Sequence, residues 1–377
     1  MATNSELQTV GGAVADAPPP AQVLVIYAGG TIGMEAGERG LVPGRDFADR
    51  MSSALATLPV ERRSGLPDYE LRESPTPIDS SSAKPSDWSH IAELIAAHYQ
   101  DYCGFVVLHG TDTLAWCAST LTFQLQGLTK PVIVTGSQRP LGVHASDALA
   151  NLEAALTFAA SDSLREVGLV FGGRLLRGCR TRKIYTHDTR GFESPNCPIL
   201  GEIVDGDAKL HVDRFLANQG APRFELVSLP ETASVVRLPL WPGMDPALVA
   251  RWLEMESVRG GVLECWGSGN LPEDAALIGV LAQAVGAGKT LVAVSQCPVG
   301  SLNVGAYASG ETLNEIGVLS GDDMTTEAAF CKLLHLLSQQ LPLPEVRRRF
   351  LTPLSGERST LSVAPDRAPQ AEDASTG

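Results

Sequence analysis

Four side chains that could take part in catalysis lie at comparable places in the sequence, shortly after apolar segments. Thr31 follows the run AQVLVIY (21–27) and two glycines, while Thr111 and Asp112 directly follow GFVVLHG (104–110). Lys183 lies in RLLRGCRTRK, which follows EVGLVFGG (166–173). A hydroxyl nucleophile needs a base that takes its proton and a carboxylate that orients that base. These residue types therefore favour nucleophilic catalysis by a threonine.

Each of these residues also has an ordinary structural explanation. Thr31 after a glycine pair suits a turn, and Thr111, Asp112 and Thr113 suit a helix N-cap. Lys183 is also explained as one solvated cation in an arginine-rich loop. The segment GGTIG matches neither a phosphate-binding loop nor G-x-G-x-x-G, so it gives no support to a nucleotide-binding protein, the generic alternative for such a fold.

The apolar segments alternate with helical patterns, which indicates a parallel sheet with both faces covered. Further strand-like segments are PVIVTG (131–136) and EVGLVFGG, and helical patterns cover 90–99, 113–126 and 146–160. The sequence thus predicts a doubly wound, mainly parallel α/β domain. Ligands bind at the carboxyl ends of such strands, so we expect the four candidate residues to meet at one edge of the sheet.

The alternation restarts near residue 234 and predicts a second, smaller α/β domain. Its strand-like segments are SVVRLPL (234–240), GGVLECWG (260–267) and TLVAVSQC (290–297). We therefore expect an N-terminal domain at 21–215, a linker at 216–232 and a C-terminal domain at 233–351. Residues 1–20 and 352–377 lack periodicity and are predicted to be a disordered leader and tail.

The bulk composition excludes several classes of protein. A net charge of −14 and a pI near 5.0 argue against nucleic-acid binding, and no eighteen-residue apolar stretch predicts a membrane span. The seven cysteines are odd in number and form no CxxC, so they indicate reduced thiols. With no secretory signal in the first twenty residues, the expected location is the cytoplasm.

Longer motifs resemble the bacterial asparaginase family, specifically its cytoplasmic type I branch. These are AGGTIGM, GFVVLHGTDTLAWCASTLTFQL, KPVIVTGSQRP, SDALANLEAAL, RGCRTRK, GSGNLP, SQCPVGSLN and AYASGETLNEIGVLSGDDMTTEAAFCKLLHLLSQ, and the similarity spans roughly residues 22–350. The resemblance implies a two-domain α/β fold and hydrolysis of L-asparagine to L-aspartate and ammonia without metal or cofactor. It also implies a homodimer or homotetramer.

The resemblance also implies roles for individual residues. Thr31 matches the nucleophile that forms an acyl-enzyme, and Thr111, Asp112 and Lys183 match a second triad that relays protons. Asp79 and Ser80 match residues that bind the substrate's α-carboxylate and α-amino groups. The resemblance further implies that backbone N–H groups near Thr111 and Ser137 stabilise an oxyanion, and that Asn270 reaches the site of a neighbouring subunit.

Two departures from the family pattern affect this interpretation. Leu41 occupies the place of a loop tyrosine, so either the enzyme is a weakened, asparagine-binding or sensing protein, or another phenol such as Tyr307 enters the site. Glu264 and Arg182 stand where allosteric relatives carry other residues, although Cys297 matches, so we expect no regulatory asparagine site. The remaining enzyme alternatives are a glutamine-tolerant amidohydrolase and the ammonia-releasing subunit of a tRNA-dependent amidotransferase.

Overall fold

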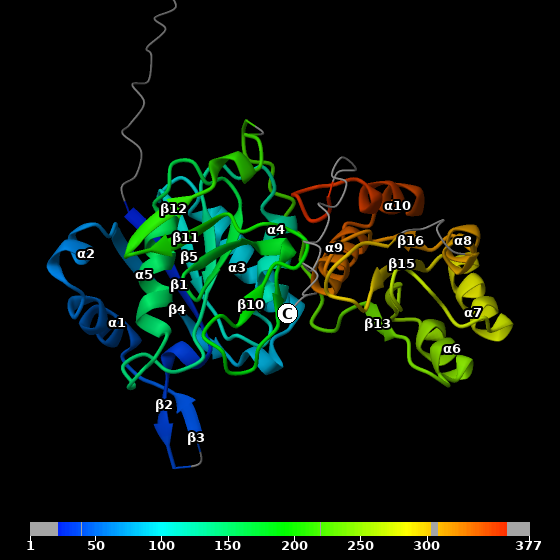
Figure 1. The fold of residues 1–377 in the computed structure, drawn as a ribbon, viewed down its shortest axis with the longest axis horizontal. Helices are drawn as coiled ribbons and strands as arrows, with labels where there is room; N and C mark the ends of the chain where they lie inside the picture. Colours follow the sequence, from blue (N-terminus) through cyan, green and yellow to red (C-terminus); the bar gives the residue numbers. More distant parts are fainter. Residues whose placement is uncertain (1–21, 39, 219, 303–307, 360–377) are drawn as a thin grey trace, which may run out of the picture.

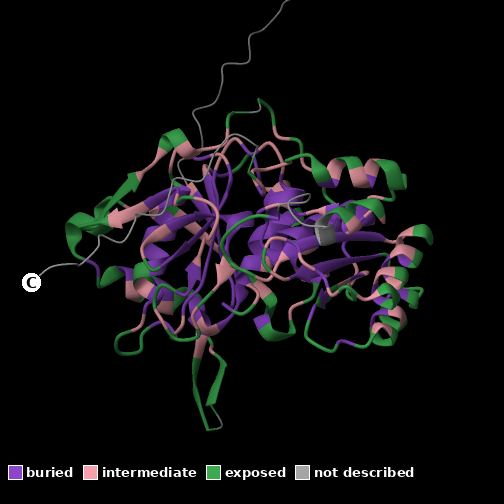
Figure 2. Cartoon of the chain, turned by 45° about the vertical axis from the view of Figure 1, so that its right-hand side comes forward, coloured by how far each residue is buried: buried purple, intermediate pink, exposed green. Residues whose placement is uncertain are grey.

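The computed structural model describes residues 22–38, 40–218, 220–302 and 308–359. The predicted leader at 1–20 and most of the predicted tail lie outside these residues. An eight-stranded and a four-stranded sheet organise the described chain (Figure 1), and buried strands and helices form its centre while exposed segments lie at the periphery (Figure 2). Among the described residues, no helix combines the length and apolarity that crossing a bilayer requires.

The larger sheet has eight strands in the order β12-β11-β8-β7-β6-β5-β1-β4. The parallel part comprises β1 (Gln22–Gly29), β4 (Asp68–Ile78), β5 (Gly104–Leu108), β6 (Val132–Thr135) and β7 (Val167–Phe171). The strands β8 (Arg174–Arg177), β11 (Gly201–Val204) and β12 (Asp207–Leu210) extend it in antiparallel pairs. The predicted mainly parallel α/β sheet is therefore confirmed.

Helices cover both faces of this sheet because alternate residues of each strand face opposite sides. In β1, Leu24 and Ile26 pack with α3 (Pro85–Ala97) and α4 (Leu114–Gln124). Val23 and Val25 pack on the other face with α1 (Phe47–Ala56) and α5 (Ala148–Ala159). Smaller elements of this domain are the hairpin β2 (Met34–Gly37) and β3 (Gly40–Pro43), α2 (Val60–Ser64), β9 (Arg182–Lys183) and β10 (Phe192–Glu193).

The smaller sheet contains four parallel strands in the order β13-β14-β15-β16. They are β13 (Val235–Pro239), β14 (Gly260–Cys265), β15 (Thr290–Ser295) and β16 (Leu319–Ser320). One face packs against α9 (Thr326–Ser338) and α10 (Leu343–Leu351), and the other against α6 (Pro246–Glu254) and α7 (Ala275–Gly286). The short helix α8 (Ala308–Glu315) lies above α7 at the right-hand end of the molecule in Figure 1.

The two domains share a packed interface in which α4 lies against α9 (Figure 1). The rings of Trp116 and Phe330 meet edge to face with centroids 5.1 Å apart. Phe123 and Cys179 from the N-terminal domain join the core cluster of the C-terminal domain. The C-terminal domain is therefore fixed against the helix that directly follows Thr111 and Asp112.

The start of the predicted disordered tail is ordered in this structure. Glu357 is fully buried and pairs with Lys332 of α9, which is also fully buried. The carboxylate of Glu357 accepts hydrogen bonds from the backbone of Leu354 (3.0 Å) and Ser355 (2.8 Å). The prediction of a disordered tail from residue 352 is therefore wrong for residues 352–359, because a buried ion pair anchors a segment that lacks an apolar pattern.

Candidate active site

The predicted catalytic threonines lie just beyond the carboxyl ends of two neighbouring parallel strands. Thr31 opens a 3-10 turn directly after β1, and Thr111 follows β5, which pairs with β1. Gly30 has a positive φ of 90°, and a side chain there would approach the backbone nitrogen of Gly110 to 2.3 Å. Only glycine allows this approach, so the turns that carry Thr31 and Thr111 are packed against each other.

Ser80 belongs to the same group of turns. A side chain at Gly110 would approach Ser80 Oγ to 2.3 Å. Ser80 is 5% exposed, its hydroxyl accepts a 3.4 Å hydrogen bond from the backbone of Asp112, and its carbonyl accepts one of 2.8 Å from Thr113 Oγ1. The turns after β1, β4 and β5 therefore meet at one edge of the sheet.

Lys183 completes the cluster from the antiparallel side of the domain. Its Nζ donates a 2.9 Å hydrogen bond to Thr111 Oγ1 and a 2.7 Å hydrogen bond to Asp112 Oδ1. The lysine side chain is 23% exposed. Lys183 is therefore ion-paired and hydrogen-bonded, and the side chain of its partner Asp112 is 59% exposed.

Of the three residues considered for a helix N-cap, Thr113 alone occupies that position. The N-cap of α4 is Thr113, and its side chain makes no capping hydrogen bond because it bonds to Ser80. The hydroxyl of Thr111 instead accepts from an ammonium group. A hydroxyl and a carboxylate that each contact the same ammonium form a chain along which a proton can move.

The loop that carries Ser137 is held by Asp147, the N-cap residue of α5, and by Asn151 within α5. The carboxylate of Asp147 accepts hydrogen bonds from the backbone of Gln138 (2.9 Å) and Arg139 (3.0 Å). Asn151 donates to the carbonyl of Gly136 at 3.0 Å. Ser137 itself is 1% exposed, and its hydroxyl donates to the carbonyl of Arg139 at 2.5 Å. Sequence reasoning missed Asp147 and Asn151, although both open the helical pattern SDALANLEAAL at a spacing of four.

A buried histidine supports the turn from beneath. His109 is 1% exposed, and its Nε2 accepts a 3.2 Å hydrogen bond from Trp88 Nε1. Burial lowers the pKa of His109 below its ordinary value of 6.5. The imidazole therefore stays neutral at neutral pH, one residue before Gly110.

The other predicted site residues occupy more scattered places. Asp79 is exposed, and its carboxylate accepts from the backbone of Ser81 at 3.0 Å. Asn270 lies in the C-terminal domain, where its backbone pairs with that of Trp266 after β14. Leu41 lies on β3 and is 49% exposed. Tyr307 lies outside the described residues.

The positions predicted to differ from allosteric relatives are both ion-paired. Arg182 lies 3.6 Å from Glu327, and Glu264 accepts a 2.7 Å hydrogen bond from Arg237. Cys297 is an exposed free thiol. The first pair joins β9 to α9, and the second joins β13 to β14 within the smaller sheet.

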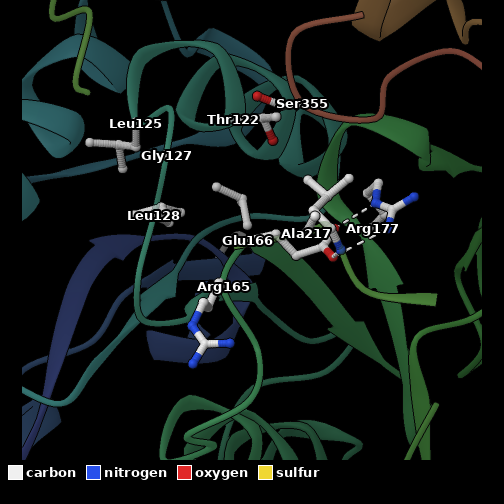
Figure 3. A pocket seen from close by; sticks show the side chains of 11 residues that line it. Thr122, Leu125, Gly127, Leu128, Arg165, Glu166, Arg177, Ala217 and Ser355 are labelled. Carbon is white, nitrogen blue, oxygen red and sulfur yellow. Dashed lines mark hydrogen bonds and ion pairs between the residues drawn. The ribbon is translucent and has the colours of Figure 1, made fainter. Parts of the chain in front are cut away.

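The cavity drawn in Figure 3 is separate from the cluster around Lys183. It lies beside the buried ion pair between Glu166 and Arg177, whose atoms Oε2 and Nε are 2.5 Å apart. Its wall contains none of the nine predicted site residues and is lined by Thr122, Leu125, Gly127, Leu128, Arg165, Glu166, Val167, Arg177, Leu216, Ala217 and Ser355. In the described part of the chain, no group of three or more His, Cys, Asp or Glu side chains is arranged to hold a metal ion.

Family models and known proteins match the sequence of this chain. The family model for the asparaginase N-terminal domain matches residues 22–215, and that for the glutaminase/asparaginase C-terminal domain matches residues 234–350. L-asparaginase 1 of Escherichia coli strain K12 is 41% identical over 338 residues, which cover 89% of this chain and 97% of the relative. The L-asparaginase of Thermococcus kodakarensis is 31% identical over 340 residues, with 89% and 98% covered.

Solved structures agree with the sequence matches. The crystal structure of L-asparaginase I from Vibrio cholerae O1 biovar eltor superimposes with a TM-score of 0.80 at 36% identity, covering 90% of this chain and all of that chain.

Proposed function

Because the chain belongs to the asparaginase family, we infer that it is an amidohydrolase that converts L-asparagine and water into L-aspartate and ammonia. The observation that carries this function is the contact of Lys183 with both Thr111 and Asp112, beside the turn that carries Thr31. We propose that this arrangement supplies the nucleophile and a proton relay.

In the proposed mechanism, Thr31 attacks the carbon of the substrate's side-chain amide. The C–N bond then breaks, and the amide nitrogen leaves as ammonia after it receives the proton that the Thr31 hydroxyl gave up. An ester now joins Thr31 to the aspartyl group. Water attacks that ester and releases L-aspartate, and the proton of the water returns to Thr31. The roles of Thr111, Asp112 and Lys183 are to accept and return these protons.

Substrate binding is proposed for the turns beside the relay. Asp79 and Asp112 supply carboxylates for the α-amino group, and Ser80 supplies a polar contact for the α-carboxylate. Backbone N–H groups near Thr111 and Ser137 would stabilise the oxyanion, since the hydrogen bonds of Asp147 and Asn151 fix the second of these loops in advance. We also propose that Asn270 contributes to the site of a neighbouring subunit in a homodimer or homotetramer.

We propose the cytoplasm as the location, with domains at 21–215 and 233–351. The seven cysteines are all free thiols in the structure, which supports a reducing compartment. The family-model boundaries support the two-domain division. Tyr307 remains our candidate for the phenol that the β2–β3 hairpin lacks at Leu41, and no observation favours the binding-only alternative.

The direct test is ammonia release from L-asparagine, L-glutamine and D-asparagine by the wild-type protein and by Thr31→Ala. We expect rapid release from L-asparagine, which Thr31→Ala abolishes while the folded spectrum is retained. The matched control is Thr57→Ala, since Thr57 is an exposed residue at the end of α1. Full activity in Thr31→Ala would remove Thr31 as the nucleophile, and no release by the folded wild type would refute the proposed function.

A further inference from the structure

Two of the three residues before Lys183 are arginines, Arg180 and Arg182, and both pair with carboxylates of the C-terminal domain. The side chain of Arg180 is 3% exposed, and it donates to Asp323 Oδ1 at 3.0 Å and to Oδ2 at 2.5 Å. Arg182 lies 3.6 Å from Glu327. Asp323 lies just before α9 and Glu327 in its first turn. The segment that leads into Lys183 is therefore attached to the other domain.

The C-terminal segment that contains Glu357 and Ser359 forms hydrogen bonds to both members of the ion pair between Arg180 and Asp323. Ser359 donates to Asp323 through its backbone nitrogen at 2.9 Å and through its hydroxyl at 2.5 Å. Arg180 also donates to the carbonyls of Glu357 and Asn196, both at 2.7 Å. Burial raises the pKa of Asp323, but the hydrogen bonds from Arg180 and Ser359 outweigh it, so the pKa is lowered and the carboxylate stays charged.

The sheet gives Lys183 little independent support. The strand β9 contains two residues and, within the part of the chain that the structure describes, pairs only with the two-residue strand β10. Arg180 is three residues from Lys183, a reach of at most about 10 Å along an extended chain. The carbonyl of Arg180 also accepts from Ser194 Oγ at 3.0 Å, next to β10. A shift of Arg180 would therefore be transmitted to the backbone of Lys183.

We propose that Asp323 is a positioning residue for the reaction, which holds Arg180 and through it the strand that carries Lys183. The C-terminal domain thereby sets the distances from the lysine ammonium to Thr111 and Asp112. This inference rests on the proposed role of Lys183 in the proton relay. A displacement of about 1 Å at a reacting group can cost about 100-fold in rate, so the relay is sensitive to this attachment.

The test compares Asp323→Asn with Asp322→Asn by steady-state ammonia release. Asp322 is the adjacent residue, has a φ of 56° that asparagine tolerates, and pairs with Arg358 at 3.3 Å instead of Arg180. We expect Asp323→Asn to lower kcat about 10- to 100-fold with KM changed less than about threefold. We expect Asp322→Asn to retain the wild-type kcat. Equal kcat values in the two variants overturn the inference.

A double-substitution cycle separates positioning from a general loss of structure. If Asp323 acts through Lys183, Asp323→Asn has no further effect on the residual kcat of Lys183→Met. Multiplying losses would overturn the inference. If Asp323→Asn does not fold, Ser359→Ala replaces it, with an expected loss of about two- to fivefold in kcat relative to Asp322→Asn; an unchanged kcat would then overturn the inference.

The same measurements keep the inference distinct from the proposed function. A wild-type kcat in Lys183→Met would remove the relay itself, and the positioning inference with it. A large loss in Lys183→Met together with a wild-type kcat in Asp323→Asn would leave the relay in place and refute only the role of Asp323.

Discussion

The ion pair between Lys332 and Glu357 provides the sharpest test of how the C-terminal segment is held. Both side chains are fully buried. The ammonium of Lys332 donates to the carbonyls of Phe350 (2.8 Å) and Thr352 (2.7 Å) as well as to Glu357. In Glu357→Gln the remaining oxygen can still accept from Lys332, but the amide NH2 cannot accept from the backbone N–H of Ser355, and the buried ammonium loses its counter-charge. Leaving one charge of a buried pair uncompensated costs about 3–5 kcal/mol.

The pH dependence of this loss follows from the lysine. Burial lowers the pKa of Lys332 below its ordinary value of 10.5, and Glu357 opposes that shift. Without Glu357 the folded pKa falls further, while the unfolded pKa does not change. Raising the pH towards 10.5 therefore relieves the penalty on the folded variant. The destabilisation of Glu357→Gln should be largest at neutral pH and shrink as the pH rises.

The assay is urea unfolding followed by tryptophan fluorescence at neutral pH and at about pH 9. The matched control is Glu345→Gln, because Glu345 pairs with Arg348 on the exposed side of α10. We expect no measurable change in the control and recovery of at least half of the lost stability in Lys332→Met/Glu357→Gln. A loss in Glu357→Gln no greater than in the control would show that this buried pair does not stabilise the fold.

Three further predictions concern the site. Lys183→Met should lower kcat about 10²- to 10⁴-fold in the ammonia assay, because the relay loses its central group, whereas Lys209→Met on the exposed strand β12 should not. Gly30→Ala should lower kcat about 100-fold without unfolding the protein, because the methyl group of the alanine must displace Gly110. A wild-type kcat in this variant would contradict the close packing of the two turns. Burial lowers the pKa of His109, so the folded protein keeps this histidine neutral, and its contribution to stability is complete above pH 6.5 and is lost as the pH falls. Between pH 6.5 and about pH 5, the free energy of unfolding should therefore fall less in His109→Gln than in the wild type. Urea titration at each pH measures this difference.

The sequence predicted the buried strands because both faces of the parallel sheet are covered. The segments at 104–110 and 131–136 are continuous apolar runs, and β5 and β6 lie within them. The strand β4 was not predicted, since its sequence DYELRESPTPI lies at the sheet edge and none of its residues is buried. Periodicity detects burial, and an edge strand without buried residues gives no such signal.

The candidate site was predictable to the extent that it depends on strand ends. Thr31, Thr111 and Asp112 lie where the apolar runs stop, so the topology of the sheet predicts their convergence. The supporting partners could not be predicted, because Asp147 bonds to the loop at 138–139, and Asp323 bonds to Arg180 across 143 residues of sequence. Polar contacts over such separations leave no periodic pattern.

Thr111 and Lys183 are held in the candidate site by different kinds of contact. Thr111 follows a strand paired on both sides within an eight-stranded sheet, so backbone hydrogen bonds and a packed core fix its position. A strand pair as short as β9–β10 has marginal stability on its own. Its second strand is held by Arg174 of β8, which donates to Glu193 at 3.0 Å and to the carbonyl of Phe192 at 2.9 Å. Because the contacts of Arg174 and Arg180 hold the strands around Lys183, we expect substitutions that weaken them to reduce catalysis before they reduce the stability of the large sheet.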